Sequence, residues 1–234
     1  MEKIIFSVIV PVRDEERMIG PALERLEAAF APGEAELIVV DGQSRDRTAE
    51  IARSRPRVRV ISSPPGRGGQ LNRGAAAARG EVFLFLHVDA ALPPGAPEMI
   101  RAALAEPGAD GGCFRIATAA DPGRGRLYRL LLKTADWRSL YTRLPYGDQA
   151  IFVTREIFEK LGGFKDYPIM EDLDFSRRLA REGRIVRLPA RVRVSGRRWE
   201  KNLLGNFLKL KTFPLLFRLG VSPERLARLY REVR

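Results

Sequence analysis

Charged side chains directly follow apolar, β-rich runs at three places where a carboxylate could bind a ligand. They are Arg13, Asp14 and Glu15 after the run 4–10, Asp41 after the run 36–40, and His87 and Asp89 at the end of the run 82–87. Such carboxylates can accept hydrogen bonds from a nucleotide base or ribose, and they can bind Mg²⁺ or Mn²⁺ that bridges a diphosphate. The alternative interpretation of each group is a turn that ends a strand, and a single His-x-Asp is a weak signal.

A further carboxylate pair, Glu171 and Asp172, begins the helix expected over residues 171–182. The positive end of a helix dipole favours an ionised carboxylate, which is the state that a general base requires. The alternative interpretation of Asp172 is ordinary charge in the first turn of a helix. Asp148, within the stretch YGDQ at 146–149, is another acidic candidate.

Two basic segments could hold phosphate. Residues 64–74, PPGRGGQLNRG, form a glycine-rich loop that opens a helix and contains Arg67 and Asn72. The loop has neither the Gly-Lys-Ser/Thr of a P-loop nor the spaced glycines of a dinucleotide site, so a flexible turn is its alternative interpretation. Residues 195–199, SGRRW, offer Arg197, Arg198 and Trp199 as contacts for a phosphate or an acceptor, or else form a solvated basic face.

The elements that must position these residues alternate between strand and helix over the first 90 residues. Apolar runs predict strands over 4–10, 36–40, 58–61 and 82–87, and helical periodicity predicts helices over 15–30, 46–53 and 71–79. Later segments predict strands over 112–117, 149–154 and 185–194 and helices over 96–105, 155–161, 171–182 and 202–217. A last helix begins at Ser222 and Pro223. The order predicts an α/β protein with a mostly parallel central sheet flanked by helices, whose ligand binds beyond the carboxyl ends of the strands.

Composition excludes several classes of site. Among 234 residues, a single cysteine, Cys113, excludes an internal disulfide and a cysteine-rich metal centre. A single histidine, His87, excludes a multi-histidine metal site and leaves a Ser–His–Asp hydrolase only one possible base. Charged catalysis must therefore depend mainly on Asp, Glu, Lys and Arg.

The charge of the chain is concentrated at its end. The net charge is +12, and residues 181–234 hold 15 basic and 4 acidic residues, which indicates an anionic partner. We expect one domain over residues 1–200 with basic amphipathic helices over 201–234 packed on it. Residues 201–218 could contact a membrane surface peripherally, or their apolar face could pack on the domain or on a second subunit of a homodimer. The apolar run at the start is too short to span a membrane, so we expect a cytoplasmic protein, with the inner face of the membrane as its peripheral site.

The motifs occur in an order that resembles a known family. In chain order they are SVIVPVRDEE (7–16), DGQSRDRT (41–48), LNRGAAAARGEVFLFLHVDA (71–90), GDQAIF (147–152), LGGF (161–164) and MEDLDFSRRL (170–179). They resemble the inverting family 2 glycosyltransferases with the GT-A fold, whose N-terminal half is Rossmann-like. The finer pattern LHVDA, GDQAIF and SGRRW is similar to a small bacterial subgroup associated with arsenosugar biosynthesis and radical-SAM gene neighbourhoods.

The resemblance implies a function and a role for each site residue. The function is single, metal-assisted transfer of a sugar, with inversion, from a UDP- or GDP-sugar to the hydroxyl group of an unidentified acceptor. The residues implied to bind the donor nucleotide are Pro11, Arg13, Glu15, Asp41, Arg67, Asn72, His87, Asp89 and Asp148. Asp89 is implied to bind Mn²⁺ or Mg²⁺ together with His87, and Asp172 is the implied base, next to Glu171.

The sequence departs from the family pattern at two of these positions. Arg13 replaces an aromatic residue that stacks on the base, and His87 replaces the first Asp of the DxD motif, which affects the ribose contact and the metal preference. Two alternatives have no transfer activity: a glycosyltransferase-like protein that only binds nucleotide, and a basic protein that binds nucleic acid or a membrane surface. A nucleotidyltransferase is disfavoured because residues 11–17 lack glycine. Nucleic acid is not an expected partner, because it leaves the acidic residues at the strand ends unexplained.

Overall fold

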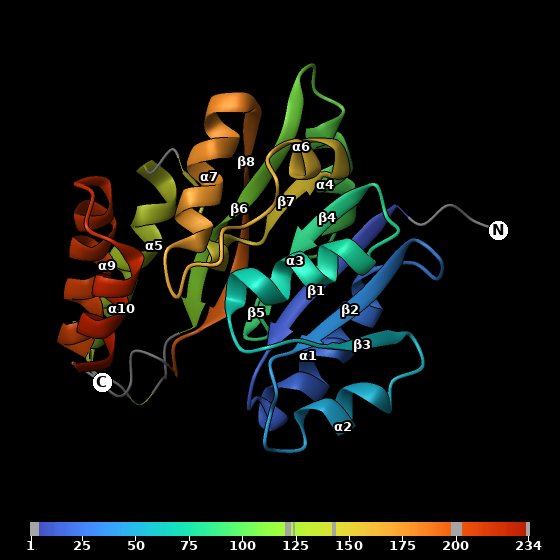
Figure 1. Cartoon of the computed structure of the whole chain (residues 1–234), viewed down its shortest axis with the longest axis horizontal. Helices are drawn as coiled ribbons and strands as arrows, with labels where there is room; N and C mark the ends of the chain where they lie inside the picture. The colour runs from blue at the N-terminus through green and yellow to red at the C-terminus, as the bar shows by residue number, and fades with distance from the viewer. Residues whose placement is uncertain (1–4, 120–122, 124, 142–143, 198–202, 233–234) are drawn as a thin grey trace.

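A computed structural model describes residues 5–119, 123, 125–141, 144–197 and 203–232 of the chain (Figure 1). Its first half contains four parallel strands in the order β3-β2-β1-β4. These strands are β1 (Phe6–Val12), β2 (Ala35–Asp41), β3 (Val58–Ser62) and β4 (Val82–Phe85). The helices that connect them are α1 (Glu16–Ala29), α2 (Thr48–Arg53) and α3 (Arg67–Ala77). The predicted alternation of strand and helix is confirmed, although β4 ends before His87 and α3 begins earlier than expected.

The second half extends the same sheet with mixed pairing. β7 (Ile151–Thr154) is antiparallel to both β4 and β6 (Ala109–Ala119), and β8 (Arg184–Ser195) runs parallel to β6. The short β5 (Ala90–Ala91) pairs with β8 at the edge. Helices α4 (Ala96–Leu104), α6 (Arg155–Lys160) and α7 (Glu171–Glu182) complete the layers. The result is an eight-stranded, mostly parallel sheet covered by helices.

The sheet has an apolar core on each face because its central strands are buried on both sides. On β1, Val8 and Val10 pack on the face that α1 covers, whereas Ile9 packs on the face that α3 covers. Helix α3 lies especially close to the sheet: a Cβ at Gly74 would meet the Ile9 side chain at 2.4 Å. The start of α3 lies at the carboxyl ends of the strands, because Arg67 and Gln70 line the same cavity as the residues that end β1.

A layer of three helices lies beside the second half of the sheet, at the left of Figure 1. It consists of α5 (Arg126–Tyr141), α9 (Leu203–Arg218) and α10 (Pro223–Glu232), and α9 contacts both others. The predicted cap is present, because the Ser222 hydroxyl accepts a hydrogen bond from the Arg225 N–H. No helix of the described residues is long and apolar enough to cross a membrane.

Candidate functional site

A cavity of about 190 Å³ opens where β1 and β4 end. β1 lies between β2 and β4, and the helices that follow β1 and β3 cover opposite faces, so this is the switch point at which open α/β sheets bind ligands. The residues that line the cavity are Pro11, Val12, Arg13, Glu15, Arg67, Gln70, His87, Val88 and Asp89. Six of these were predicted as site residues from the sequence.

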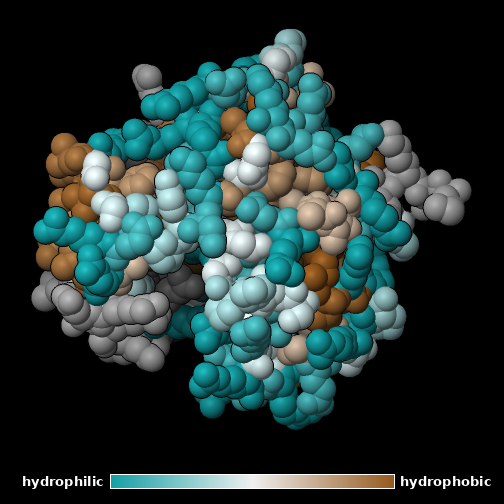
Figure 2. All heavy atoms as spheres, in the orientation of Figure 1, coloured by the Kyte–Doolittle hydropathy of each residue, from teal (hydrophilic) through white to brown (hydrophobic). Residues whose placement is uncertain are grey.

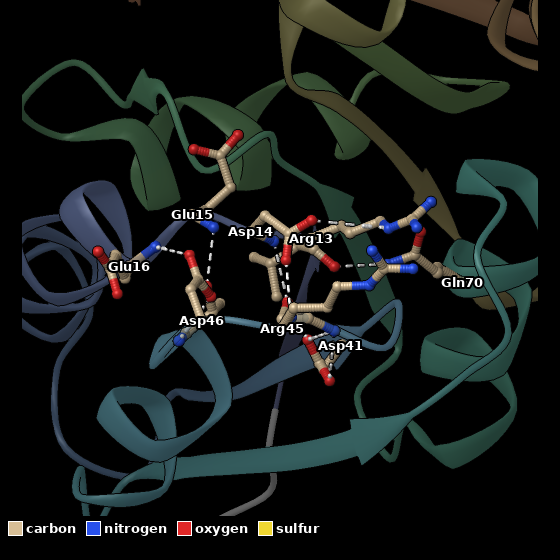
Figure 3. A network of polar contacts seen from close by, with 11 residues as sticks. Arg13, Asp14, Glu15, Glu16, Asp41, Arg45, Asp46 and Gln70 are labelled. Atoms are coloured by element: carbon tan, nitrogen blue, oxygen red, sulfur yellow. Dashed lines mark hydrogen bonds and ion pairs between the residues drawn. The ribbon is translucent and has the colours of Figure 1, made fainter.

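The loop after β1 is tied to the loop after β2 by hydrogen bonds from main-chain N–H groups to side-chain oxygens (Figure 3). The Asp14 N–H donates to the Ser44 hydroxyl at 3.0 Å, and the Asp14 carboxylate accepts from the Arg45 N–H at 2.7 Å. The Glu15 N–H donates to the Thr48 hydroxyl at 2.7 Å. These bonds fix the backbone on both sides of Asp14 and so hold the side chains of its neighbours at the mouth of the cavity.

Asp41 and Gln70 form the floor behind this loop. Asp41 is buried and accepts hydrogen bonds from the main chain and the hydroxyl of Ser44, but it does not line the cavity. The buried Gln70 amide donates to the Val12 carbonyl at 3.0 Å and to the Val40 carbonyl at 2.8 Å, and it therefore joins the ends of β1 and β2. The sequence analysis did not identify Gln70 as a site residue. Its position, a polar residue in the first turn of the helix that follows the glycine-rich loop, was the signal that could have identified it.

Arg197 links two carboxylates that line the cavity, those of Glu15 and Asp89. Its Nη2 donates to Glu15 Oε1 at 2.6 Å and lies 3.9 Å from Asp89 Oδ2. The hydrogen bond that Arg197 donates to Glu15 raises the pKa of Arg197, against the opposing effect of partial burial. The Asp89 side chain is only 3% exposed. The main-chain carbonyl of Asp89 accepts a hydrogen bond from the Ser195 N–H at 3.0 Å, which fixes the end of β8 beside it.

Asp172 lies in a second group of charges at the N-terminus of α7. Its Oδ2 accepts from the Gly147 N–H and its Oδ1 from the Leu173 N–H, both at 2.8 Å. The Arg67 guanidinium lies 3.8 Å from Asp172 Oδ2 and forms an ion pair with the buried Glu171. Because Arg67 also lines the cavity, it connects this carboxylate pair to the ligand site.

The pKa shifts in this group reflect burial and mutual attraction. Burial opposes the charge of Arg67, but Glu171 and Asp172 outweigh it and raise its pKa. Burial also raises the pKa of Glu171, with Asp172 adding to the effect and Arg67 opposing it. Arg67 therefore remains a cation beside Asp172.

Gly147 brings His87 close to Asp172. A Cβ at Gly147 would lie 3.0 Å from His87 Nε2 and 3.1 Å from Asp172 Oδ2, so both side chains approach its backbone. Sequence reasoning did not assign a role to this glycine. The requirement for a residue without a side chain arises from contacts among the loop after β4, the 147–149 turn and α7, which are distant in the sequence.

Backbone strain is concentrated around the same residues. Among the described residues, the non-glycine residues with positive φ are Asp14, Gln43, Ala150 and Met170. Each lies within two residues of a predicted site residue. Such conformations cost energy and tend to occur at functional sites, where the surrounding structure fixes them.

The structure does not bring every predicted residue to the cavity. The Asn72 amide exchanges two 2.8 Å hydrogen bonds with the main chain of Phe164, so its role here is to fix the segment before α7. Asp148 also lies off the cavity, and its charge contributes to the raised pKa of Arg67. Arg198 and Trp199 lie outside the described residues.

The side chains at the cavity fit a divalent cation that takes few ligands from the protein and most of them from a bound phosphate and water. Asp89 supplies a carboxylate and His87 a nitrogen, and Arg197 already places a positive group beside Asp89. Within the described part of the chain, no group of three or more His, Cys, Asp or Glu forms a complete cage. Mg²⁺ and Mn²⁺ at phosphate sites commonly take few protein ligands and complete their shell with phosphate oxygens and water.

Comparisons with known proteins agree on one family. Residues 7–162 match the model described as glycosyl transferase family 2. The chain is 28% identical over 206 residues to the probable glycosyltransferase YdaM of Bacillus subtilis, covering 80% of this chain and 49% of that protein. It spans about half or less of the curated relatives that it matches.

Solved structures support the fold. S. aureus TarS 1-349 in complex with UDP-GlcNAc superposes with a TM-score of 0.65 at 23% identity, over 82% of this chain and 58% of that one. The mannosyltransferase PcManGT from Pyrobaculum calidifontis, in complex with GDP-Man and Mn²⁺, superposes with a TM-score of 0.60 at 22% identity. The superposition covers 80% of this chain and 56% of that one. The predicted GT-A fold is confirmed, and at these identities the likeness concerns the fold alone.

Proposed function

Because the chain belongs to glycosyl transferase family 2, we propose that it transfers a sugar from a nucleotide-diphosphate sugar to the hydroxyl group of an acceptor, with inversion. The observation that carries this proposal is the position of Arg67. It lines the cavity at the switch point and also lies 3.8 Å from Asp172, so a donor site and a candidate base share one residue.

The nucleotide binds at the ends of β1 and β2 in this proposal. Pro11 and Arg13 line the cavity, and the Asp41 carboxylate behind them can accept a hydrogen bond from a ring N–H of the base. Arg13 provides a planar cation for stacking in place of an aromatic ring. Arg197 is released from Glu15 and binds a phosphate of the donor. The relatives crystallised with UDP-GlcNAc and GDP-Man support a UDP- or GDP-sugar as the donor class.

Asp172 is the proposed general base. Its two main-chain hydrogen bonds fix the carboxylate, and a side-chain exposure of 13% leaves it accessible to an acceptor. It takes the proton of the acceptor hydroxyl while that oxygen forms a bond to the anomeric carbon. The bond from that carbon to the diphosphate breaks on the opposite face, and the electron pair leaves with the diphosphate. One such displacement inverts the configuration without a covalent enzyme intermediate.

Mn²⁺ or Mg²⁺ is the proposed cofactor, held by Asp89 with His87 beside it. When bound, the ion supplies positive charge that stabilises the leaving diphosphate. The Mn²⁺ in the PcManGT complex supports a divalent metal cofactor in general. Single addition and membership of the arsenosugar-associated subgroup remain predictions from the sequence.

A thermal-shift panel tests the proposal. UDP, GDP, CDP and dTDP are each added with and without Mn²⁺ or Mg²⁺, to the wild type and to Asp89→Asn. We expect one diphosphate to raise the melting temperature more with metal than without, since a ligand of the folded state stabilises it. The variant should lose the metal-dependent part of the shift. If no diphosphate shifts the wild type under any condition, the donor assignment is wrong.

A further inference from the structure

Exposed apolar side chains collect in the layer of three helices. Among the described residues, all six large hydrophobic side chains that are strongly exposed belong to α5, α10 or α9 and the turn that follows it. They are Leu130, Trp137, Leu208, Leu215, Leu219 and Leu229. Figure 2 shows hydrophobic side chains gathered at this end of the molecule. Clusters of this kind on a surface mark an interaction site more often than scattered single residues do.

On α5 the exposed apolar residues alternate with basic ones along one face. Arg126, Arg129, Leu130, Lys133 and Trp137 are exposed at helical spacing, and the first four line a shallow hollow. The acidic residue of this helix, Asp136, instead accepts hydrogen bonds from the main chain and the hydroxyl of Thr118 on β6. The outer face of α5 is therefore apolar and basic.

The outer face of α9 has the same character. Leu208, Lys211, Leu215, Arg218 and Leu219 are exposed at helical spacing, and α9 contains no Asp or Glu. We call the five exposed α5 residues and these five residues together the basic–apolar face. The two helices contact each other.

The fold already has partners for the inner face of α9. Phe213 is buried against Tyr230 of α10, with ring centroids 6.3 Å apart, and Phe217 packs edge-on against Tyr167 at 6.4 Å. Contacts with α10 and Tyr167 thus account for these aromatic residues. They leave the leucines of the basic–apolar face in contact with solvent.

We propose that the basic–apolar face binds the surface of a membrane that contains anionic lipids. Leucine and tryptophan side chains can enter the boundary between headgroups and acyl chains, while lysine and arginine contact lipid phosphates. Each basic group near an anionic surface adds attraction. A second copy of the chain fits less well, because a two-fold interface would place this positive face against itself. A nucleic acid would match the basic groups but not the exposed leucines.

Vesicle flotation of the full chain tests this proposal. The vesicles are either pure phosphatidylcholine or an equimolar mixture with phosphatidylglycerol. Three double variants are compared with the wild type: R129E/K133E reverses charge, L208Q/L215Q removes apolar contact, and R25E/R53E is the matched charge-reversal control on exposed arginines of α1 and α2. All six positions are exposed, and circular dichroism with a melting curve verifies that each variant is folded.

We expect the wild type and R25E/R53E to float with the anionic vesicles and not with phosphatidylcholine alone. Both face variants should partition at least about tenfold more weakly. Three results would overturn the proposal: a wild type that does not float, face variants that float as the control does, or a dimeric wild type that L208Q/L215Q converts to a monomer. The last result would identify the face as a subunit interface.

Discussion

Arg197 and Glu15 form an ion pair between residues 182 positions apart, with 2.6 Å between Nη2 and Oε1. The same nitrogen lies 3.9 Å from Asp89 Oδ2. One guanidinium thus faces both the carboxylate at the mouth of the cavity and the carboxylate that we assign to the metal. A cation that binds Asp89 must therefore compete with Arg197, and a bound diphosphate would attract Arg197 away from it.

The first prediction concerns this competition. We expect Arg197→Gln to increase the affinity of the ligand-free protein for Mn²⁺ by about 2- to 5-fold, a modest effect because the pair is partly exposed. Its affinity for the nucleoside diphosphate should fall, since a phosphate contact is lost. Titration calorimetry with Mn²⁺ and then with diphosphate measures both effects. Arg193→Gln, at an exposed position on β8 four residues before Arg197, is the control, and equal Mn²⁺ affinity in both variants would contradict the competition.

The second prediction isolates the proposed base. Asp172→Asn keeps an oxygen that can accept from the Gly147 N–H, so the protein should fold and should bind nucleotide as the wild type does. It cannot take the acceptor proton, so we expect kcat to fall by about 10²- to 10⁴-fold. A transfer assay and a thermal shift with diphosphate separate the two effects.

Asp174→Asn is the matched control for that experiment. Asp174 lies on the same helix but is paired with Arg178 at 2.8 Å and Lys165 at 3.4 Å, away from the cavity lining. This variant should retain most of the activity. Asp172 is not the base if Asp172→Asn transfers sugar at the wild-type rate.

The sequence was most informative where local pattern and position in the sheet coincide. The apolar runs predict the central strands, and parallel strands place their carboxyl ends at one edge, so the sequence alone places Arg13 and Asp89 at one ligand site. The resemblance singled out Asp172 as a candidate base, and its predicted place in the first turn of a helix is confirmed.

Long-range contacts explain what the sequence did not predict. Asn72 was expected at the cavity because of its loop, but its partner is the main chain of Phe164, 92 residues away. The Gln70 amide on α3 donates hydrogen bonds to carbonyls of two strands, β1 and β2, which are distant in the sequence. Helix α5 was not predicted for a different, local reason. Leu130 and Trp137 lie on its exposed face, so its apolar residues do not follow the pattern of a helix with one buried side.

The third prediction tests the contact among Gly147, His87 and Asp172. In Gly147→Ala the new Cβ would lie 3.0 Å from His87 Nε2 and 3.1 Å from Asp172 Oδ2, and the ends of both side chains must move. Side-chain ends move at little cost in stability, but a small displacement of a catalytic group can reduce the rate by about 10²-fold. We expect a large loss of kcat with a nearly unchanged melting temperature.

Gly125→Ala is the control for this substitution, because no atom lies within 4 Å of its Cβ position. It should change neither quantity. A Gly147→Ala protein with full activity would show that His87 and Asp172 need not occupy their present positions.

The last prediction concerns Glu36, a buried carboxylate far from the cavity lining. It accepts hydrogen bonds from the Ser7 hydroxyl at 2.7 Å, from the Gly80 N–H at 3.3 Å and from the main chain and side chain of Arg79. Burial raises its pKa, but the bonds from Ser7 and Arg79 outweigh this effect and bring the pKa below the ordinary 4.5. The ionised carboxylate therefore stabilises the fold above pH 4.5, and this contribution is lost as the pH falls through the lowered pKa.

We expect Glu36→Gln to lower the free energy of unfolding by about 1–3 kcal/mol at neutral pH, because its amide group turns a donor toward other donors. The difference from the wild type should shrink as the pH falls below 4.5, where the wild-type carboxylate also becomes protonated. Urea unfolding of both proteins over this range measures it. Glu50→Gln, at an exposed position paired with Arg47, is the control and should be nearly neutral throughout. A difference between Glu36→Gln and the wild type that stays constant with pH would mean that the charge of Glu36 does not contribute and that only its shape and packing matter.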